Sequence, residues 1–191
     1  DGIDDYVAAF TELVSVSYHA IDRFDRKAHG RRNVLGVWGD GNLAFITSLL
    51  LKKRFPESKV YIFGKHEYKM DDFVFADETY FIDSIPEDLR IDHGFECVGK
   101  AGSGTSINQI IDYINPEGCI AALGVSEDPV PINTRMILEK GLTLYGSSRS
   151  SADDFRHLLQ FYKEHPEVVD YLRNISPVWE KLTKGETPHV I

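Results

Sequence analysis

The sequence lacks the features of proteins that bind nucleic acids or span membranes. Lysine and arginine number 21 against 30 aspartates and glutamates, so the net charge is −9 at pH 7. Without a basic excess to neutralise phosphates, we expect no nucleic-acid partner. No apolar run reaches the roughly 18 residues of a transmembrane helix, and no signal-peptide pattern occurs. We therefore expect no membrane partner and a cytoplasmic location.

Cysteine is also scarce. Cys97 and Cys119 both lie in apolar stretches, which is more typical of reduced core thiols than of a disulfide. Glycine (15 residues) and proline (8 residues) are not in excess, and 42% of the 191 residues are hydrophobic. This composition is that of a globular protein, and the length suits one domain with an appended arm.

Two kinds of apolar stretch alternate along the chain. Short continuous runs are typical of strands buried on both faces, and longer stretches with a spacing of three or four are typical of helices. We expect strands at 33–38, 59–64, 78–83, 93–99, 119–125 and 142–147, and helices at 3–24, 42–54, 103–115, 132–140 and 150–165. This order predicts an α/β fold with a doubly wound, six-stranded parallel sheet.

A glycine turn follows the first expected strand. The stretch GVWGDGNLA (36–44) contains Gly39, Gly41 and Ala44 in the pattern G-x-G-x-x-A, directly before the helix at 42–54. In a Rossmann-type fold the first glycine permits the tight turn, the second lets a pyrophosphate approach, and the third small residue permits close packing. The turn therefore predicts a dinucleotide site at a helix N-terminus. The alternative is a tight turn that binds nothing.

The end of the second strand bears on the choice of nucleotide. NAD sites place an acid about 20 residues beyond the glycines, on the ribose 2′-hydroxyl. Here Gly64 stands at that place, followed by Lys65, His66 and Lys69. A small residue followed by cations suits a ribose 2′-phosphate, so we expect NADP(H) in preference to NAD(H). The alternative is that Lys65 and His66 are solvated loop residues.

With these elements in place, the sequence resembles the cofactor-binding domain of the zinc-type medium-chain dehydrogenases. The stretches that carry the resemblance are AAFTELVSVSYHAI, GVWGDGNLA, GFECVGKAGSG, INPEGCIAALGV and KGLTLYGSSRS. Within that superfamily it is most similar to the ribitol-5-phosphate (ribulose-5-phosphate) reductases that supply CDP-ribitol for teichoic acid and capsule polymers. The resemblance covers residues 8 to 165 and implies hydride transfer between NADPH and ribulose 5-phosphate.

The resemblance also implies which residues meet the cofactor. The pyrophosphate would lie along Gly39, Asp40, Gly41, Asn42 and Leu43. The adenosine ribose or its phosphate would contact Gly64, Lys65 and His66. Those beside the nicotinamide ribose would be Cys97, Val98, Gly99, Leu123, Gly124 and Val125. The last strand is followed by Ser147, Ser148 and Arg149. The Arg149 guanidinium is a candidate to bind a cofactor or substrate phosphate through two hydrogen bonds.

The substrate domain of the family has no counterpart in this sequence. There is no Cys or His cluster before residue 19 and no G-H-E motif. We therefore expect residues 1–30 to form a linking helix from an absent substrate domain and residues 31–150 to bind the dinucleotide. Residues 151–191 would form C-terminal helices and begin the return of the chain to the substrate domain. Such a piece would bind nucleotide without reducing substrate, and the zinc would belong to the intact enzyme.

Glu12 matches a glutamate that lies near the catalytic zinc in related dehydrogenases, although ELV replaces the family's EPL here. An exposed helix carboxylate is the alternative for Glu12. A packing or surface role is favoured for His19, two helical turns away, and a packed thiol for Cys97.

Two other functions fit parts of the sequence. Another NAD(P)-dependent sugar-alcohol dehydrogenase remains open, and a SAM-binding methyltransferase is disfavoured because it needs an acid where Gly64 stands. The apolar last strand, GLTLYG, is suited to pair with a second copy, so we expect a homodimer through it.

Overall fold

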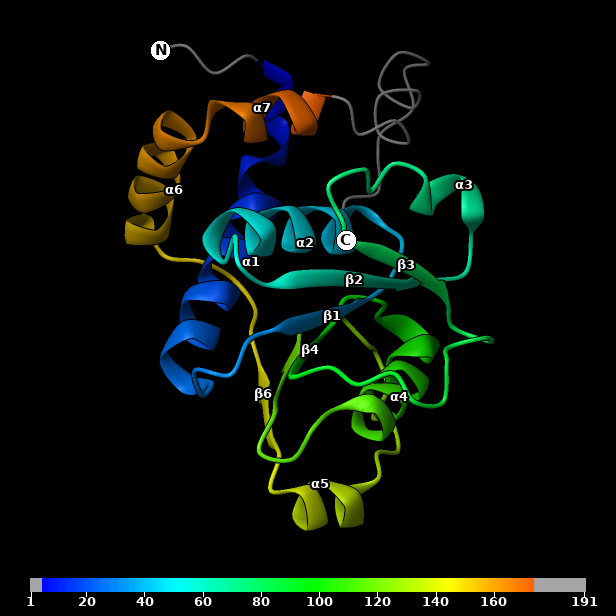
Figure 1. Cartoon of the computed structure of the whole chain (residues 1–191). Helices are drawn as coiled ribbons and strands as arrows, with labels where there is room; N and C mark the ends of the chain where they lie inside the picture. The colour runs from blue at the N-terminus through cyan, green and yellow to red at the C-terminus, as the bar shows by residue number, and fades with distance from the viewer. Residues whose placement is uncertain (1–4, 174–191) are drawn as a thin grey trace.

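The computed structural model describes residues 5–173, and a six-stranded sheet lies at its centre (Figure 1). Its strand order is β3-β2-β1-β4-β5-β6, and every neighbouring pair is parallel. The strands are β1 (Val34–Trp38), β2 (Lys59–Gly64), β3 (Glu78–Phe81), β4 (His93–Glu96), β5 (Cys119–Ala122) and β6 (Thr143–Gly146). This is the strand order of the dinucleotide-binding fold, and the predicted α/β architecture is confirmed.

Helices cover both faces of the sheet (Figure 1). On one face α1 packs against α2, α6 and α7, while α4 packs on the other face against β1, β4 and β5. The helices are α1 (Asp5–Lys27), α2 (Asn42–Arg54), α3 (Glu67–Met70), α4 (Ser103–Tyr113), α5 (Thr134–Lys140), α6 (Ala152–Glu164) and α7 (Pro166–Arg173), with a 3₁₀ turn at Lys100–Gly102. None of these helices is long and apolar enough to cross a membrane.

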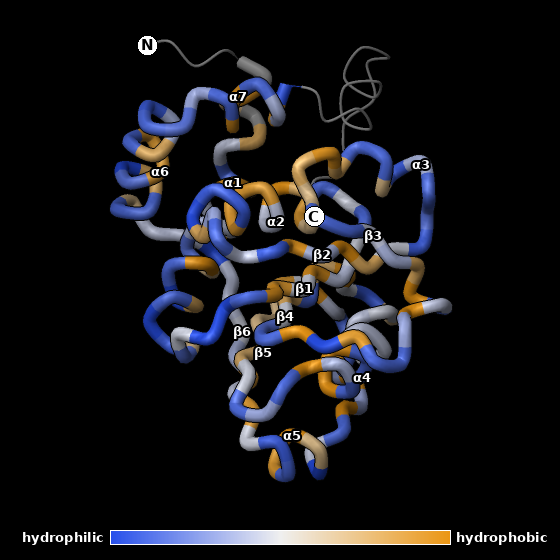
Figure 2. Tube along the Cα trace, viewed as in Figure 1, coloured by the Kyte–Doolittle hydropathy of each residue, from blue (hydrophilic) through white to orange (hydrophobic). Residues whose placement is uncertain are grey.

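The sheet separates two hydrophobic cores, which appear as apolar stretches along the strands and the inner sides of the helices (Figure 2). Along β1, Leu35 and Val37 enter the core under α1 and α2, whereas Trp38 enters the core under α4. The Trp38 ring stacks on Phe63 with centroids 3.8 Å apart, and its indole N–H donates to Gln109 at 3.0 Å. Burial on both faces explains why these strands are continuously apolar in sequence.

Several boundaries differ from the sequence-based expectation. Strands β4 and β5 end at Glu96 and Ala122 rather than at 99 and 125, because the chain turns there to form loops at the sheet edge. Helix α3 was not predicted, since four residues are too few to show a periodicity. Helix α1 continues to Lys27, three residues beyond its predicted end. The predicted segments 1–4 and 174–191 lie outside the described residues.

Candidate dinucleotide site

The turn between β1 and α2 is built on Gly39. Its φ angle of +131° is one that side-chain-bearing residues rarely adopt. A Cβ at this position would lie 3.1 Å from the carbonyl oxygen of Cys97 and 3.2 Å from the Cβ of Ala44. The Gly39 N–H also donates to the Phe63 carbonyl at 2.8 Å. Glycine at 39 and alanine at 44 therefore allow the turn, the end of β4 and helix α2 to meet closely.

Gly41 has a different environment. It is the residue before α2, and a Cβ built on it would have no atom within 4 Å. Helix α2 has no side-chain cap and no acidic residue in its first turn. The first backbone N–H groups of a helix have no partner within it, and they carry the positive end of its dipole. The turn thus offers an open, electropositive helix end to an anion.

Asp40 joins this turn to the end of β2. Its Oδ2 accepts from the backbone N–H groups of Lys65 and His66, both at 2.9 Å, and lies 2.8 Å from His66 Nδ1. Lys69 Nζ lies 3.8 Å from the other oxygen. Burial alone would raise the pKa of Asp40, but these hydrogen bonds and the Lys69 charge together lower it. The carboxylate is therefore ionised and fixes the loop after β2.

Gly64 has little free space beside it. A Cβ there would lie 2.8 Å from the Met70 sulfur and 3.0 Å from the Asp40 Cβ. The space beside Gly64 is thus occupied by Met70 and Asp40, and the exposed groups of the loop are Lys65 and His66. A hollow adjoins the loop and is lined by Asp40, Gly41, Asn42, Phe45, Lys69, Asp72 and Phe73.

Glu96, at the end of β4, organises the next two loops, and sequence analysis did not single it out. Its side chain is fully buried, and its Oε1 accepts from the N–H groups of Val98 at 2.9 Å and Gly99 at 2.7 Å. Its Oε2 accepts from Gly124 N–H at 3.2 Å, across the gap to the loop after β5. Two features of the sequence could have indicated its role: Glu96 is an acid within an apolar run, and glycines follow both strands at Gly99 and Gly124.

The loops after β4 and β5 present an apolar surface at the sheet edge. Val98 and Val125 are 41% and 62% exposed, whereas Leu123 and Cys97 are buried. Burial raises the pKa of the Cys97 thiol far above its usual range. Burial also raises the pKa of Cys119, to about 11. Both cysteines are free and neither is a reactive thiolate, which confirms the packed-thiol prediction.

The loop after β6 contributes Ser147 and Arg149. The Ser147 side chain is 5% exposed, and its buried hydroxyl has no hydrogen-bond partner. Arg149 is exposed and has a positive φ of 65°, which is uncommon for arginine. The segment is held to α1 by a 2.7 Å hydrogen bond between the Ser150 and Ser15 hydroxyls. A buried hydroxyl without a partner and an exposed guanidinium thus lie at this edge.

The predicted cofactor segments meet at the carboxyl edge of the sheet. Backbone contacts link Gly39 to Cys97 and to the end of β2, and link the loop at Gly99 to that at Val125. The Ser147 N–H donates to the Ala122 carbonyl at 3.0 Å. Ligands of open α/β sheets bind at this edge, where the strand order reverses. Here the reversal falls between β1 and β4.

Glu12, the candidate metal ligand, and His19 both lie on α1. Glu12 is exposed, and His19 Nδ1 lies 3.0 Å from Asp154 of α6, so that His19 helps to fasten α6 to α1. Across residues 5–173, no three His, Cys, Asp or Glu side chains are grouped to hold a metal ion.

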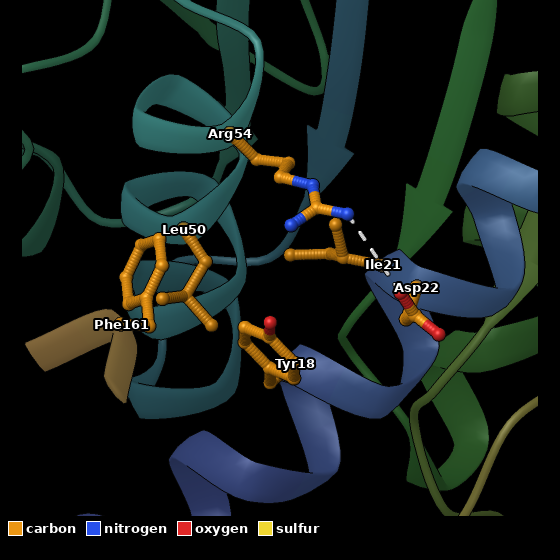
Figure 3. A pocket seen from close by; sticks show the side chains of 6 residues that line it. All are labelled: Tyr18, Ile21, Asp22, Leu50, Arg54 and Phe161. Atoms are coloured by element: carbon orange, nitrogen blue, oxygen red, sulfur yellow. Dashed lines mark ion pairs between the residues drawn. The ribbon is translucent and has the colours of Figure 1, made fainter. Parts of the chain in front are cut away.

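A second hollow lies between α1, α2 and α6 (Figure 3). Ile21, Leu50 and Phe161 make it largely apolar, and Arg54 and Asp22 form an ion pair at 3.8 Å beside it. It adjoins the C-terminal half of α2, away from the glycine turn. We regard it as a packing crevice between helices.

Comparison with known proteins places this edge in context. Residues 69–164 match the family described as zinc-binding dehydrogenase. The ribulose-5-phosphate reductase of Bacillus spizizenii is 58% identical over 175 residues, and ribulose-5-phosphate reductase 1 of Staphylococcus aureus is 56% identical over 172. These alignments cover 92% and 90% of this chain but 51% and 50% of the relatives. The chain therefore spans about half the length of the curated relatives it matches.

Solved structures agree with the sequence matches. The crystal structure of S. aureus TarJ in complex with NADPH superposes with a TM-score of 0.87 at 56% identity, covering 91% of this chain and 55% of that one. The D-arabinose dehydrogenase of Sulfolobus solfataricus, with a TM-score of 0.68 at 18% identity, shares the fold. On the family match and these likenesses, the chain belongs to the zinc-binding dehydrogenase family.

Proposed function

We propose that this chain is the cofactor-binding half of an NADPH-dependent ribulose-5-phosphate reductase, which reduces ribulose 5-phosphate to ribitol 5-phosphate. The observation that carries the proposal is the glycine turn, which leaves an open helix N-terminus at the switch point of the sheet. Support comes from the reductases that are 58% and 56% identical to it and from the NADPH complex of TarJ. A cytoplasmic location is part of the same proposal.

The domain organisation belongs to this proposal as well. Residues 1–30 would link to the substrate domain, residues 31–150 would bind the dinucleotide, and residues 151–191 would begin the return of the chain to the substrate domain. The coverage of only half of each relative supports this division. We expect the chain alone to bind NADPH but not to reduce ribulose 5-phosphate.

The residues along the carboxyl edge of the sheet would each contact a different part of the cofactor. The helix end at Gly41 would hold the pyrophosphate, and Lys65 and His66 the ribose 2′-phosphate. Val98 and Val125 would flank the nicotinamide ribose and exclude water. The full set proposed for the cofactor is Gly39, Asp40, Gly41, Asn42, Leu43, Gly64, Lys65, His66, Cys97, Val98, Gly99, Leu123, Gly124, Val125, Ser147 and Arg149.

The side chains of Cys97 and Leu123 are buried, so their contribution would come from the backbone. The hydroxyl of Ser147 lacks a partner and would be satisfied by a polar group of the cofactor or substrate. Arg149 is suited to a phosphate because its guanidinium is exposed and forms a planar fork. When bound, the nicotinamide supplies the hydride.

The zinc of the family is not assigned to this chain. Glu12 was the one candidate ligand, and the residues described here do not surround it with partners for a metal ion. Four ligands, or three with an open position, are usual for zinc. We propose that the zinc site, like most of the substrate site, lies in the other half of the enzyme.

We also propose a homodimer formed through β6. This strand lies at one edge of the sheet, next to β5 alone; Thr143 is exposed along it, and the Gly146 carbonyl accepts from Arg23 at 2.7 Å. An uncovered edge strand presents unpaired backbone groups that a second copy can complete. Light scattering after size-exclusion chromatography would give twice the 21.6 kDa chain mass for a dimer and the single mass if the proposal is wrong.

Calorimetric titration with NADPH and NADH at low salt tests the cofactor proposal. We expect NADPH to bind at least about tenfold more tightly, which corresponds to a charge-assisted contact of about 1.5 kcal/mol. Lys65→Asp should remove this preference, whereas Lys163→Asp, the same change at an exposed site on α6, should preserve it. Failure of both dinucleotides to bind would contradict the proposed function, and equal affinities would contradict the choice of NADPH.

A further inference from the structure

The contact between Asp40 and His66 fixes where the histidine carries its proton. Asp40 Oδ2 lies 2.8 Å from Nδ1 and also accepts the backbone N–H groups of Lys65 and His66. Because these contacts hold the carboxylate in its ionised form, Asp40 has no proton to donate. The hydrogen between them must therefore be on Nδ1 of the histidine.

The other ring nitrogen is then an acceptor whenever the ring is neutral. A neutral imidazole carries one N–H, so a proton on Nδ1 leaves a lone pair on Nε2. The His66 side chain is 48% exposed, and Nδ1 is its anchored end. An outward lone pair repels a phosphate oxygen, whereas a protonated Nε2 donates a charge-assisted hydrogen bond to it.

The charged and titratable neighbours of His66 come from two sides. Asp40 faces it from the glycine turn, Lys65 precedes it, and Tyr68 of α3 lies with ring centroids 5.9 Å away. The remaining ionisable groups of α3 and its end are Glu67, Lys69, Asp71 and Asp72. Of these residue types, histidine is the one that ordinarily changes charge between about pH 5 and 8.

We propose that His66 is a specificity residue that recognises the 2′-phosphate of NADPH only in its protonated form, so that binding of NADPH takes up a proton and binding of NADH does not. The inference rests on the proposed function above and adds a pH dependence to it. The proton comes from the solvent and goes to Nε2, while Asp40 holds Nδ1–H throughout. The preference for NADPH should thus weaken as the pH rises.

The number of protons can be measured by calorimetry at pH 8. Titrating NADPH in Tris and in HEPES separates the binding enthalpy from the enthalpy of buffer ionisation, and the difference gives the proton uptake. At this pH a phosphate monoester, with a second pKa near 6, is already a dianion and contributes little uptake of its own. We expect net uptake with NADPH and none with NADH.

Two variants make the assignment specific. His66→Asn keeps a side-chain N–H for Asp40 but cannot titrate, and it should abolish the uptake. It should also lower NADPH affinity about tenfold at pH 6.5 while leaving NADH affinity within about twofold. His157→Asn makes the same change at an exposed site on α6 and should retain the uptake.

The outcomes separate this inference from the proposed function. Uptake by the native chain that is lost only in His66→Asn supports it. NADPH binding without proton uptake, or with equal uptake in His66→Asn, would overturn the inference and leave the cofactor proposal intact. Failure of NADPH to bind at any pH would overturn both.

Discussion

Removal of the buried Glu96 carboxylate should destabilise the protein strongly. In Glu96→Ala the N–H groups of Val98 and Gly99 lose their acceptor, and the bond to Gly124 is lost as well. An unpaired buried donor costs about 1–3 kcal/mol, so the buried N–H of Gly99 alone gives about this loss and the partly buried N–H of Val98 adds to it. Domains of this kind are stable by about 5–15 kcal/mol, so the variant should remain folded but with a much lower margin.

Urea unfolding followed by circular dichroism would measure this loss. Glu96→Gln keeps an acceptor for Val98 and Gly99 but places an amide N–H against the N–H of Gly124, so it should lose less than Glu96→Ala. Glu87→Ala, a matched change at an exposed position, should lie within about 0.5 kcal/mol of the native chain. A Glu96→Ala variant within 1 kcal/mol of the native chain would refute the role given to this carboxylate.

Three further predictions concern the fold and its ionisation. Gly39→Ala should lower the free energy of unfolding by about 1–3 kcal/mol, because an alanine at φ +131° is strained; unchanged stability would contradict this. Asp92 is buried, which alone would raise its pKa, but hydrogen bonds from Asn115, two backbone N–H groups and Arg31 lower it. The ionised carboxylate should therefore stabilise the folded state above about pH 4, and this stabilisation should be lost as the pH falls further. In acid titrations followed by circular dichroism, the free energy of unfolding of Asp92→Asn should depend less on pH. Cys97 is buried and should react with a thiol reagent only on unfolding; rapid labelling of the native chain would mean that the thiol is accessible.

The sequence was most informative where apolar residues run without interruption. The bounds of α2 and β2 agree with the expectation at both ends, since each is a largely apolar segment with polar residues or glycine at its borders. The ends of β4 and β5 were placed three residues too late, because Cys97 and Leu123 are buried although they lie outside the strands. Hydrophobicity reports burial, and it does not report where a strand ends.

The parts of the site that depend on distant contacts were not predicted. The glycine turn was identified from local spacing, because its positive φ and its packing are requirements of a few adjacent residues. The contacts of Asp40 with the loop after β2 and of Glu96 with Gly124 join residues more than 20 positions apart. For the same reason the filling of the space beside Gly64 could be seen only in the folded chain.

The most direct test of the account is NADPH titration of Gly41→Ala beside the native chain. A Cβ at this position meets no protein atom within 4 Å, so the free energy of unfolding should change by no more than about 1 kcal/mol. The same methyl group would stand where the pyrophosphate must approach the helix end, so NADPH affinity should fall at least about tenfold. If Gly41→Ala is stably folded and binds NADPH as tightly as the native chain, the dinucleotide does not lie on this turn.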